Sequence, residues 1–547
     1  MAIDHWLGYP VPALRREALG GDRIVSCFAE RPSSMHALFA RAVAERPTHE
    51  ALVSDEGRWT YAEAEREVAR IAAGLAALGV AKGDRVALLI GNRAAFVFVL
   101  FALQRVAAIA VPIGVREQRP GIAWMLAQCG ARAIVFDGER ADRVPDDNDV
   151  PSLRWRIAVD DSAAVAGTIS LRQLGADDRG LESAVAVAEQ DTAVILYTSG
   201  TTGSPKGAML THLNIVHSVI HFAACMRLGR DDRGALAVPA SHVTGLIATI
   251  AAMVHVGATI VVLAEFKAAD FLARVEAERV THTLMVPAMY KLCLLAPDFA
   301  RRDLRSWRIG GYGGAPMPVA TIDALAEALP GLVLVNAYGA TETTSPTTMM
   351  PAGQTRAHAD TVGVALPCAE VVVIDDAGHE VGAGETGELW IGGPMVVPGY
   401  WDNAGATATS FTAGFWHSGD LGSVDNDGYV RIFDRKKDML NRGGFKIYSV
   451  EVENALMGYP GIVEAAIVAR PCPVLGERVH AFVHAPGVAH DEAAVRAHCA
   501  ARLADYKVPE TITWSEAPLP RNANGKLMKR SLRDALLAAD PPSPWPA

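Results

Sequence analysis

Short apolar runs alternate with helix-like segments from about residue 60 to residue 340. The runs RVALLI, ARAIVFD, AVILYTS, TIVVL, THTLMVP and LVLVNAYG have the length and β-branched content of buried strands. Between them, segments such as YAEAEREVARIAAGLAALG have helical spacing and end at Gly79; their apolar face carries Val68, Ile71, Leu75 and Leu78. This alternation predicts an α/β protein with βαβ units and mostly parallel sheets, in which ligands gather at the strand ends.

The pattern changes after about residue 360, where short strand-like runs are separated by turn sequences. AEVVVIDDAGHEV, GELWIGG and GSVDNDGYVRIFD contain the turns DDAG and DNDG, which predict a small antiparallel β unit. Beyond the charged stretch DRKKD, helical segments such as SVEVENALMGY and DEAAVRAHCAARLADY indicate a further compact α+β unit. We therefore expect an N-terminal domain over residues 1–436, with a β-rich, barrel-like part at about 360–436, and a C-terminal domain over 437–547.

An uncharged stretch from Leu246 to Ala264 approaches the length of a membrane span. Gly257 divides it into a helix-like half and the strand-like run ATIVVL. We expect a buried helix followed by a buried strand rather than a transmembrane segment.

Composition and charge exclude several classes of protein. The chain has 547 residues, half of them apolar, with a formal net charge of -10 and a sequence pI near 5.9. No long Lys/Arg run is present, so neither a nucleic-acid partner nor a polybasic membrane surface is expected. The seven cysteines are scattered, and the first residues do not have the pattern of a secretory signal. A cytoplasmic protein that acts on small molecules fits best; the oligomeric state does not follow from the sequence.

One stretch carries an unusual density of hydroxyls and glycines. YTSGTTGSPKG, from Tyr197 to Gly207, follows the apolar run DTAVIL and precedes a segment with helical spacing, so we expect a loop between a strand and a helix. Glycines allow close backbone approach, hydroxyls and N–H groups donate to anionic oxygens, and Lys206 adds a cation. The loop predicts a phosphate site, although its spacing is not that of a Walker loop. The alternative is an ordinary Ser/Thr/Gly surface loop.

Three further stretches place polar groups after strands or in loops. NAYGATETT follows the run LVLV, GFWHSGDLG places Asp420 in a turn, and LPRNANGKLMKR places Lys526 in a loop near the end of the chain. Together with Lys206 they supply an aromatic ring, hydroxyls, two acids and two lysines. These groups suit a Mg-nucleotide, which needs a stacking ring, an acid for the ribose, a hard carboxylate for magnesium and cations for phosphate.

On these motifs, together with GELWIGG and DRKKDMLNRGGFKIYSVEVE, the chain resembles the adenylate-forming superfamily, which includes acyl-CoA synthetases, adenylation domains of peptide synthetases and luciferases. The motifs occur in the order of the family from residue 197 to residue 530. The resemblance implies a large AMP-binding domain and a small mobile C-terminal cap. It also implies ATP, Mg²⁺ and coenzyme A as cofactors or co-substrates.

The resemblance assigns roles position by position. The loop that matches Thr198 to Lys206 would bind the β and γ phosphates of ATP, through Thr198, Ser199, Gly200, Thr201, Thr202, Gly203 and Lys206. Adenine would lie between Tyr338, followed by Gly339, and the segment Gly313, Gly314 and Ala315, with Asn336 near the base. Thr341 would contact the α phosphate and Glu342 would bind magnesium. Asp420 and Arg435 would hold the ribose.

Lys526 would neutralise charge when a carboxylate attacks the α phosphorus, a step that brings two anions together. The resemblance also implies that the cap swings about a hinge at Lys437, so that Gly443 and Gly444 line a pantetheine tunnel. His242, in PASHVTGL, matches a position at the mouth of the acyl pocket. Packing would explain His242 equally well.

The alternative to these ligand roles is that Lys206 and Lys526 are solvated surface lysines, that Tyr338 packs in the core and that Asp420 is an ordinary turn residue. His217 and His221 are four residues apart on an expected helix, but the Glu of H-E-x-x-H is missing, so zinc is not expected.

The resemblance implies an acyl-CoA synthetase that acts through an acyl adenylate. No aspartate lies near PASHVTGL to bind a substrate ammonium, and the other expected pocket stretches are uncharged, so we expect an apolar aliphatic or aryl monocarboxylate. A freestanding ligase that loads a carrier-protein thiol is the alternative. A nucleotide-binding protein without turnover is a third reading, disfavoured because Lys526, Glu342 and Asp420 are all present.

Overall fold

The computed structural model describes residues 5–19, 23–161, 167–174, 181, 183–198, 205–487, 490–521 and 527–539. Its chain divides into two compact units. The first comprises Met1–Val372, Trp390–His417 and Asp425–Val430; the second comprises Val373–Leu389, Ser418–Val424 and Arg431–Ala547. The sequence-based boundary at Lys437 remains a prediction, because it concerns a hinge rather than a contact pattern.

A seven-stranded sheet in the first unit has the order β11-β10-β6-β5-β7-β8-β9. All neighbouring strands are parallel except β10 and β11. Its strands are β5 (Arg85–Leu89), β6 (Ile109–Pro112), β7 (Ala133–Phe136), β8 (Trp155–Ala158), β9 (Thr168–Ser170), β10 (Thr192–Thr198) and β11 (Lys206–Thr211). An antiparallel pair, β1 (Leu14–Leu19) and β2 (Arg23–Phe28), precedes it in the chain.

A nine-stranded sheet has the order β18-β17-β16-β15-β14-β12-β13-β3-β4, and its central strands from β16 to β3 are parallel. The parallel core confirms the α/β class that the alternating pattern predicts. Its strands are β3 (Glu50–Ser54), β4 (Gly57–Thr60), β12 (Arg233–Leu236), β13 (Thr259–Val262), β14 (His282–Met285), β15 (Ile309–Tyr312), β16 (Val333–Tyr338), β17 (Thr348–Met349) and β18 (Val364–Ala365).

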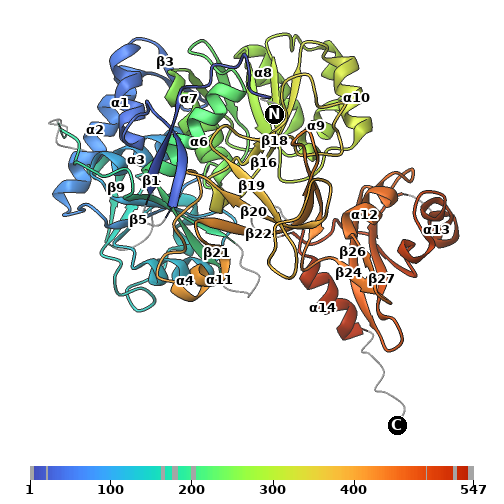
Figure 1. Cartoon of the computed structure of the whole chain (residues 1–547). Coiled ribbons are helices and arrows are strands. Elements are labelled where there is room, and N and C mark those ends of the chain that lie inside the picture. Colours follow the sequence, from blue (N-terminus) through green and yellow to red (C-terminus); the bar gives the residue numbers. More distant parts are fainter. Residues whose placement is uncertain are drawn as a thin grey trace. The chain divides into compact units, whose positions relative to one another are not determined.

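Helices of the first unit lie against these sheets (Figure 1), and most of them bury apolar side chains. In α2, Val68, Ile71 and Leu75 are fully buried and Leu78 is the C-cap, as the spacing predicts. The helices are α1 (Met35–Glu45), α2 (Tyr61–Ala77), α3 (Ala94–Arg105), α4 (Arg119–Cys129), α5 (Leu171–Leu174), α6 (His212–Cys225), α7 (Ala252–Val256), α8 (Ala268–Ala277), α9 (Pro287–Leu294), α10 (Val319–Ala328) and α11 (Ala404–Ser410), with short turns η1 (Gly138–Arg143), η3 (Phe299–Arg301) and η4 (Thr341–Thr343).

The uncharged stretch Leu246 to Ala264 folds as expected. A π-helical turn, η2 (Thr244–Ala251), continues into α7, ends at Gly257 with φ +68°, and is followed by β13. Glycine fits this C-terminal position because a left-handed residue there satisfies the last carbonyls. Among the described residues, no helix has both the length and the apolar content needed to cross a bilayer.

The hydroxyl- and glycine-rich loop is not followed directly by a helix, contrary to the sequence-based expectation. Residues Lys206–Thr211 form β11, paired antiparallel with β10 from Thr192↔Thr211 to Thr198↔Lys206. Helix α6 begins only at His212, where the Thr211 side chain accepts a hydrogen bond from the Asn214 N–H. Pairing with β10 therefore overrides the helical spacing of this segment, and the loop connects a β-hairpin.

A five-stranded sheet over the β-rich segment has the order β19-β20-β22-β21, with β23 beside β22. Both predicted turns are present: Gly378 and Gly428 have φ near +85°, and Asp375 and Asp425 accept hydrogen bonds from backbone N–H groups within the turns. The strands are β19 (Glu370–Ile374), β20 (Gly387–Gly392), β21 (Phe411–Thr412), β22 (Phe415–Val424) and β23 (Val430–Arg435).

The C-terminal part of the second unit is α+β, as predicted. A sheet of order β25-β24-β27-β26, with β28 parallel to β27, packs against α12 and α14 (Figure 1). Its elements are β24 (Leu440–Arg442), β25 (Phe445–Ile447), α12 (Ser449–Met457), β26 (Glu464–Cys472), β27 (Gly476–His484), α13 (Glu492–Ala500), η5 (Asp505–Lys507), β28 (Thr511–Ser515) and α14 (Lys529–Ala539).

Burial holds several histidines neutral. It lowers the pKa of four buried imidazoles from 6.5 to about 4: His212, His217, His282 and His480. Neither ring nitrogen of His282 has a hydrogen-bond partner among the described residues. Because the unfolded chain binds protons at these sites more readily, stability is lost as the pH falls from 6.5 towards 4.

We predict that the free energy of unfolding falls between pH 7.5 and pH 5.0. Each of these histidines should lower it by about 2 kcal/mol at pH 5. Thermal and urea midpoints at the two pH values test this. His282→Leu removes one titrating group whose nitrogens are unpaired, so it should raise the midpoint more at pH 5.0 than at pH 7.5. Equal midpoints for the unmodified chain at both pH values would contradict the prediction.

Candidate functional site

Most of the predicted nucleotide-binding residues of the first unit lie where neighbouring strands end. β15 and β16 are parallel and in register, with Tyr312 opposite Asn336. Gly313, Gly314 and Ala315 follow β15 directly, and Tyr338 is the last residue of β16. The parallel sheet therefore brings these two predicted segments to the same edge.

Gly313 lies where the two segments approach most closely. A Cβ on Gly313 would lie 2.4 Å from the carbonyl oxygen of Ala337, a distance that no side chain tolerates. Gly314 has φ +77°, and both Gly314 and Ala315 are exposed. The glycines thus let the backbone after β15 approach Ala337, the residue before Tyr338, and leave that backbone exposed.

The segment after β16 contains residues with different surroundings. Asn336 is buried, and its side-chain amide donates to the Thr361 carbonyl at 3.3 Å. Tyr338 is half-buried at the strand end, and a Cβ on Gly339 would crowd the backbone of Pro346 at 3.0 Å. The strand end is therefore held rigidly, while the Tyr338 side chain is only partly covered.

Glu342 is the centre of a polar cluster that joins three distant parts of the chain. It lies in η4 with only 8% of its surface exposed. Tyr400 donates its hydroxyl to Oε1 of Glu342 at 2.9 Å, and Thr198 donates its hydroxyl to the same oxygen at 3.3 Å. Both bonds end on Oε1, and among the described residues no hydrogen bond reaches Oε2.

Lys206 lies beside this cluster. Its ammonium group is 5.0 Å from the centroid of the Tyr400 ring, within the range of a cation–π contact. Lys206 is also the register partner of Thr198 across the β10–β11 hairpin. The structure thus brings together Thr198, Lys206 and Glu342, three residues that the resemblance assigns to phosphate and magnesium.

Tyr400 is a site residue that the sequence analysis missed. Burial, and then the Glu342 carboxylate, raise the pKa of Tyr400, so its hydroxyl stays protonated and can donate. The neighbouring backbone pairs with β11: Met209 donates to the Gly399 carbonyl at 3.1 Å and Trp401 to the Gly207 carbonyl at 2.7 Å. The tyrosine in GYW, which follows GELWIGGPMVVP, was the available signal, because a buried tyrosine hydroxyl usually has a hydrogen-bond partner.

Asp420 and Arg435, which the resemblance assigns to the ribose, form an ion pair within the second unit. Arg435 Nε lies 2.6 Å from Asp420 Oδ1. The Asp420 side chain is 5% exposed and that of Arg435 is 39% exposed. A buried carboxylate paired with a partly open guanidinium forms a rigid acceptor that could bind vicinal hydroxyls.

Lys437 and the glycine pair lie in turns of the second unit. Lys437 is exposed just after β23 ends, and Asp438 donates to the Arg435 carbonyl at 2.9 Å. Gly443 and Gly444 connect β24 to β25 with φ of +60° and +91°. Glycine is required by this left-handed backbone, and a Cβ on Gly444 would meet nothing within 4 Å.

His242 lies just before η2 and is not part of the Glu342 cluster in any contact that the structure describes. Its Nδ1 accepts a hydrogen bond from the Thr244 N–H at 3.3 Å and is 3.1 Å from the Thr244 hydroxyl. Burial lowers the pKa of His242, so the ring is neutral at pH 7 with its proton on Nε2. A neutral imidazole there suits an uncharged pocket wall.

His217 and His221 have structural roles on α6. His217 Nε2 accepts a hydrogen bond from the Phe28 N–H, and His221 Nε2 accepts one from the Cys368 N–H, both at 3.2 Å. Among the described residues, no group of three His, Cys, Asp or Glu side chains has a geometry that could hold a metal ion. That this histidine pair is not a zinc site stays a prediction.

Six predicted site residues lie outside the described residues: Ser199, Gly200, Thr201, Thr202, Gly203 and Lys526. Thr341 is described, half-buried, and opens η4 immediately before Glu342.

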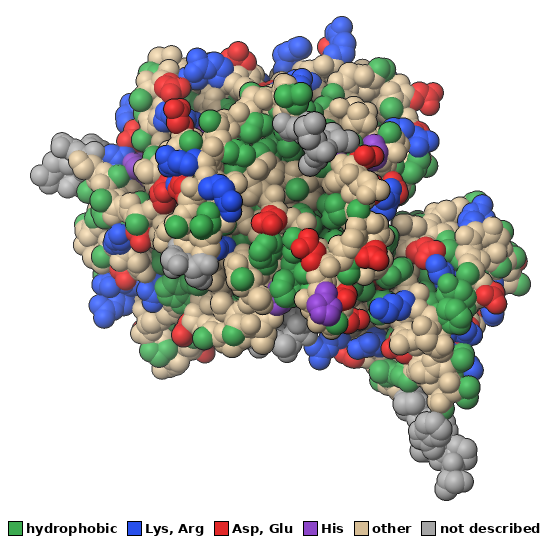
Figure 2. All heavy atoms as spheres, in the orientation of Figure 1, with side chains coloured by type: hydrophobic (Ala, Val, Ile, Leu, Met, Phe, Trp, Pro, Cys, Tyr) green, Lys and Arg blue, Asp and Glu red, His purple; other side chains and the backbone are tan. Residues whose placement is uncertain are grey.

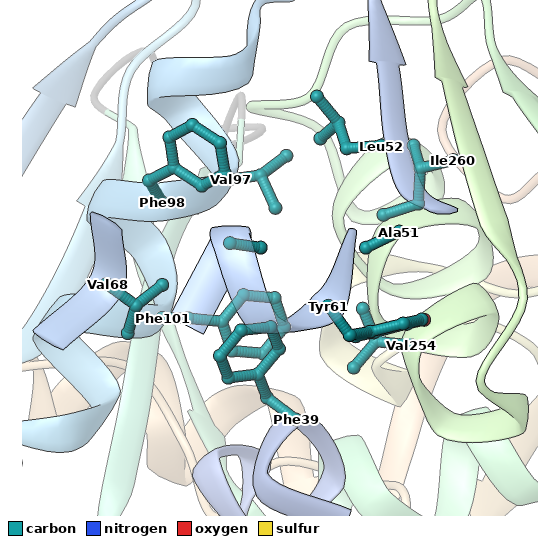
Figure 3. Close-up of a pocket in the computed structure, with 11 residues that line it drawn as sticks. Phe39, Ala51, Leu52, Tyr61, Val68, Val97, Phe98, Phe101, Val254 and Ile260 are labelled. Carbon is teal, nitrogen blue, oxygen red and sulfur yellow. The ribbon is translucent and has the colours of Figure 1, made fainter. Parts of the chain in front are cut away.

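A small apolar cavity lies between α1, α2, α3, β3 and β13 of the first unit (Figure 3). Its volume is about 10 Å³, and Phe39, Tyr61 and Phe101 are among the side chains that enclose it. That volume holds a single water molecule at most, so the cavity is a packing defect and not a substrate site.

Family models match most of the chain. The AMP-binding enzyme model matches residues 39–401, and the model of the AMP-binding enzyme C-terminal domain matches residues 451–526.

Similar proteins agree with these matches. The chain is 35% identical to a feruloyl-CoA synthase from Amycolatopsis sp, over 87% of this chain and 93% of the relative. It is 33% identical to the long-chain-fatty-acid–CoA ligase FadD13 of Mycobacterium tuberculosis, over 89% and 95% of the two chains. Among solved structures, the anthranilate CoA ligase AuaEII in complex with anthranoyl-AMP has a TM-score of 0.86 at 26% identity and covers 93% of this chain and 99% of that chain.

We predict that Tyr400→Phe weakens magnesium-dependent ATP binding about tenfold, because Glu342 loses the hydroxyl that fixes its orientation. Calorimetric titration with ATP at several magnesium concentrations measures this. Tyr61→Phe is the matched control: it removes a buried hydroxyl that donates to the Ala258 carbonyl at 2.7 Å, far from Glu342 in the contacts described. Equal ATP affinity in Tyr400→Phe and the unmodified chain would refute the role of Tyr400.

Proposed function

The chain belongs to the AMP-binding enzyme family and is an AMP-forming acid–CoA ligase, and we propose that its acid is an apolar aliphatic or aryl monocarboxylate. Such an enzyme joins the acid to AMP with release of pyrophosphate and then transfers the acyl group to the thiol of coenzyme A. Because the relatives are CoA ligases, the alternative of a carrier-protein thiol as the final acceptor is not favoured.

We propose that the Glu342 cluster binds the metal–phosphate part of ATP. The observation that carries this proposal is the meeting of Glu342, Thr198 and Tyr400 on one carboxylate oxygen, with Lys206 against the same tyrosine. A carboxylate with one oxygen that no described residue contacts, beside a hydroxyl, is the hard donor set that Mg²⁺ prefers. When bound, the metal would draw charge from the phosphate oxygens, while Lys206 supplies a second positive charge.

We propose that adenine lies between Tyr338 and the Gly313–Ala315 segment, and that Asp420 and Arg435 bind the ribose hydroxyls. The closeness of the β15 and β16 ends supports the first assignment, and the ion pair supports the second. Asn336, near the end of β16, and Thr341, just after it, then lie at the same end of the strand as Tyr338. Lys437 remains the proposed hinge, with Gly443 and Gly444 as the proposed path of the pantetheine arm.

The uncharged surroundings of His242 support an apolar acid. Residues 239–246 contain no carboxylate, and His242 is neutral, so a substrate ammonium would find no counter-charge there. The acids named for the relatives, an aryl acid and long-chain fatty acids, fall within the proposed class.

We propose a cytoplasmic location and small-molecule partners, on the state of the cysteines and the distribution of charge. All seven cysteines are unpaired and buried, which supports the proposed cytoplasmic location, where thiols stay reduced. Figure 2 shows acidic and basic side chains interspersed over the face that it draws, without a continuous basic surface on that face. Nucleic acid is therefore not among the proposed partners.

The experiment that tests the substrate class is a CoA-consumption screen over fatty acids of increasing length and a set of aryl acids. We expect consumption of CoA and ATP with apolar monocarboxylates, and none with amino acids or short dicarboxylates. Acid-dependent exchange of labelled pyrophosphate into ATP serves as the second readout. Activity confined to an amino acid or a dicarboxylate would overturn the proposed class.

We predict that Lys526→Ala separates the two half-reactions. Loss of the cation should slow adenylate formation by about 10²- to 10³-fold, because repulsion between the acid and the α phosphate is no longer offset. Conversion of supplied acyl adenylate to acyl-CoA should remain within a few fold of the unmodified enzyme. Arg530→Ala, a change of an exposed cation on the following helix, is the control. Equal loss in both half-reactions would exclude the proposed role of Lys526.

A further inference from the structure

A buried polar cluster in the second unit connects three elements through side chains to which the predicted chemistry assigns no role. It consists of Asp434 at the end of β23, Ser449 and Glu453 on α12, and Lys529 at the start of α14. Asp434 is 2% exposed and Ser449 is fully buried, while the side chains of Lys529 and Glu453 are 16% and 12% exposed. Charged groups are rarely buried to this extent without a partner or a function.

The hydrogen bonds of the cluster form a chain of donors and acceptors from Lys529 through Ser449 to Asp434. Lys529 Nζ donates to Ser449 Oγ at 2.6 Å, and Ser449 Oγ donates to Asp434 Oδ1 at 3.0 Å. The Ser449 N–H donates to the other oxygen of the same carboxylate, Oδ2. Because a hydroxyl has a single hydrogen to give, the lysine fixes the direction in which Ser449 points it.

Lys529 also neutralises a second carboxylate. Its Nζ lies 2.7 Å from Glu453 Oε1, and the Ile467 N–H donates to that oxygen at 2.7 Å. Burial raises the pKa of both Asp434 and Glu453, and the lysine opposes this effect at each. Without Lys529, two neighbouring buried carboxylates would have no shared cation, and at least one would change its protonation or its position.

Asp434 is adjacent to Arg435, whose guanidinium pairs with Asp420. Successive residues of a strand direct their side chains to opposite faces, so Asp434 faces α12 while Arg435 faces Asp420. Asp434 Oδ1 also accepts the N–H of Arg435 at 2.8 Å, and Lys436 donates its N–H to the Gly419 carbonyl at 2.8 Å. The backbone on both sides of Arg435 is therefore held, on one side by the buried carboxylate.

We propose that Lys529, acting through Ser449 and Asp434, is a positioning residue that fixes Arg435 for binding of the ATP ribose. This inference rests on the proposed ribose role of Asp420 and Arg435. Lys529 follows Lys526 by three positions, and Lys437 follows Asp434 by three positions. One buried network thus links the chain segments that carry the proposed hinge and the proposed catalytic lysine, within a single unit.

The test is steady-state and pyrophosphate-exchange kinetics of Lys529→Met. We expect the KM for ATP to rise about tenfold, the effect of one lost charge-assisted hydrogen bond, while kcat stays within about twofold. Asp434→Asn should have the same effect, and the double variant should be no worse than either single variant, since both changes break one network. Lys529→Arg keeps the cation and should hold the KM within about threefold of the unmodified enzyme.

Two variants keep the proposal testable if Lys529→Met folds poorly. Ser449→Ala removes the hydroxyl but leaves the Lys529–Glu453 ion pair and the Ser449 N–H bond to Asp434, so it should fold and still raise the KM for ATP. Arg530→Met is the matched control, because it removes a neighbouring cation of α14 that is 68% exposed and 3.8 Å from Asp534. It should leave the KM for ATP unchanged.

The outcomes separate this inference from the proposed function. If the unmodified enzyme catalyses exchange but Lys529→Met and Ser449→Ala change only the melting temperature, the network is structural and the inference is wrong. Additive losses in the double variant would also exclude it, because they would show two independent contributions. If the unmodified enzyme shows no exchange with any acid, the proposed function itself fails.

Discussion

The close approach of parallel strands β15 and β16 is the constraint on which the candidate nucleotide site depends. Glycines allow β15 to approach both of its neighbours: a Cβ on Gly311 would meet the Thr283 carbonyl of β14 at 3.0 Å, and one on Gly313, just after β15, would meet the Ala337 carbonyl of β16 at 2.4 Å. With side chains there, the sheet would have to separate at the edge that carries Tyr338 and Glu342. Gly311 and Gly313 of the GGYGG sequence are therefore required by backbone spacing before any ligand is considered.

Much of the fold could be predicted from the pattern of the sequence. The alternating runs gave strands such as β5, β7, β13 and β16, and the spacing of Val68, Ile71 and Leu75 gave α2, because burial of one face is a local property of the chain. The exception was β11, whose apolar residues fit either a strand or a helix. Only pairing with β10 and with the backbone of residues 399–401 decides between them, and neither partner is visible in a local window.

The candidate site was predictable to the extent that motifs name individual residues. Thr198, Lys206 and Glu342 were expected near one another and are, and so were Asp420 and Arg435. Tyr400 was missed because its role depends on a partner 58 positions away, and nothing in the surrounding GYW pattern requires that partner. The network of Asp434, Ser449 and Lys529 is hidden for the same reason: its members lie 15 and 80 positions apart.

The pairing of the β10–β11 hairpin has a consequence for how this family can diversify. Lys206 is held on one side by β10 and its strand is held on the other by the backbone around Tyr400. The position of the cation is thus set by β10 on one side of β11 and by the backbone around Tyr400 on the other, rather than by the residues that join β10 to β11. Evolution, or an engineer grafting loops between homologues, could therefore lengthen or replace that connection while the ammonium stays in place.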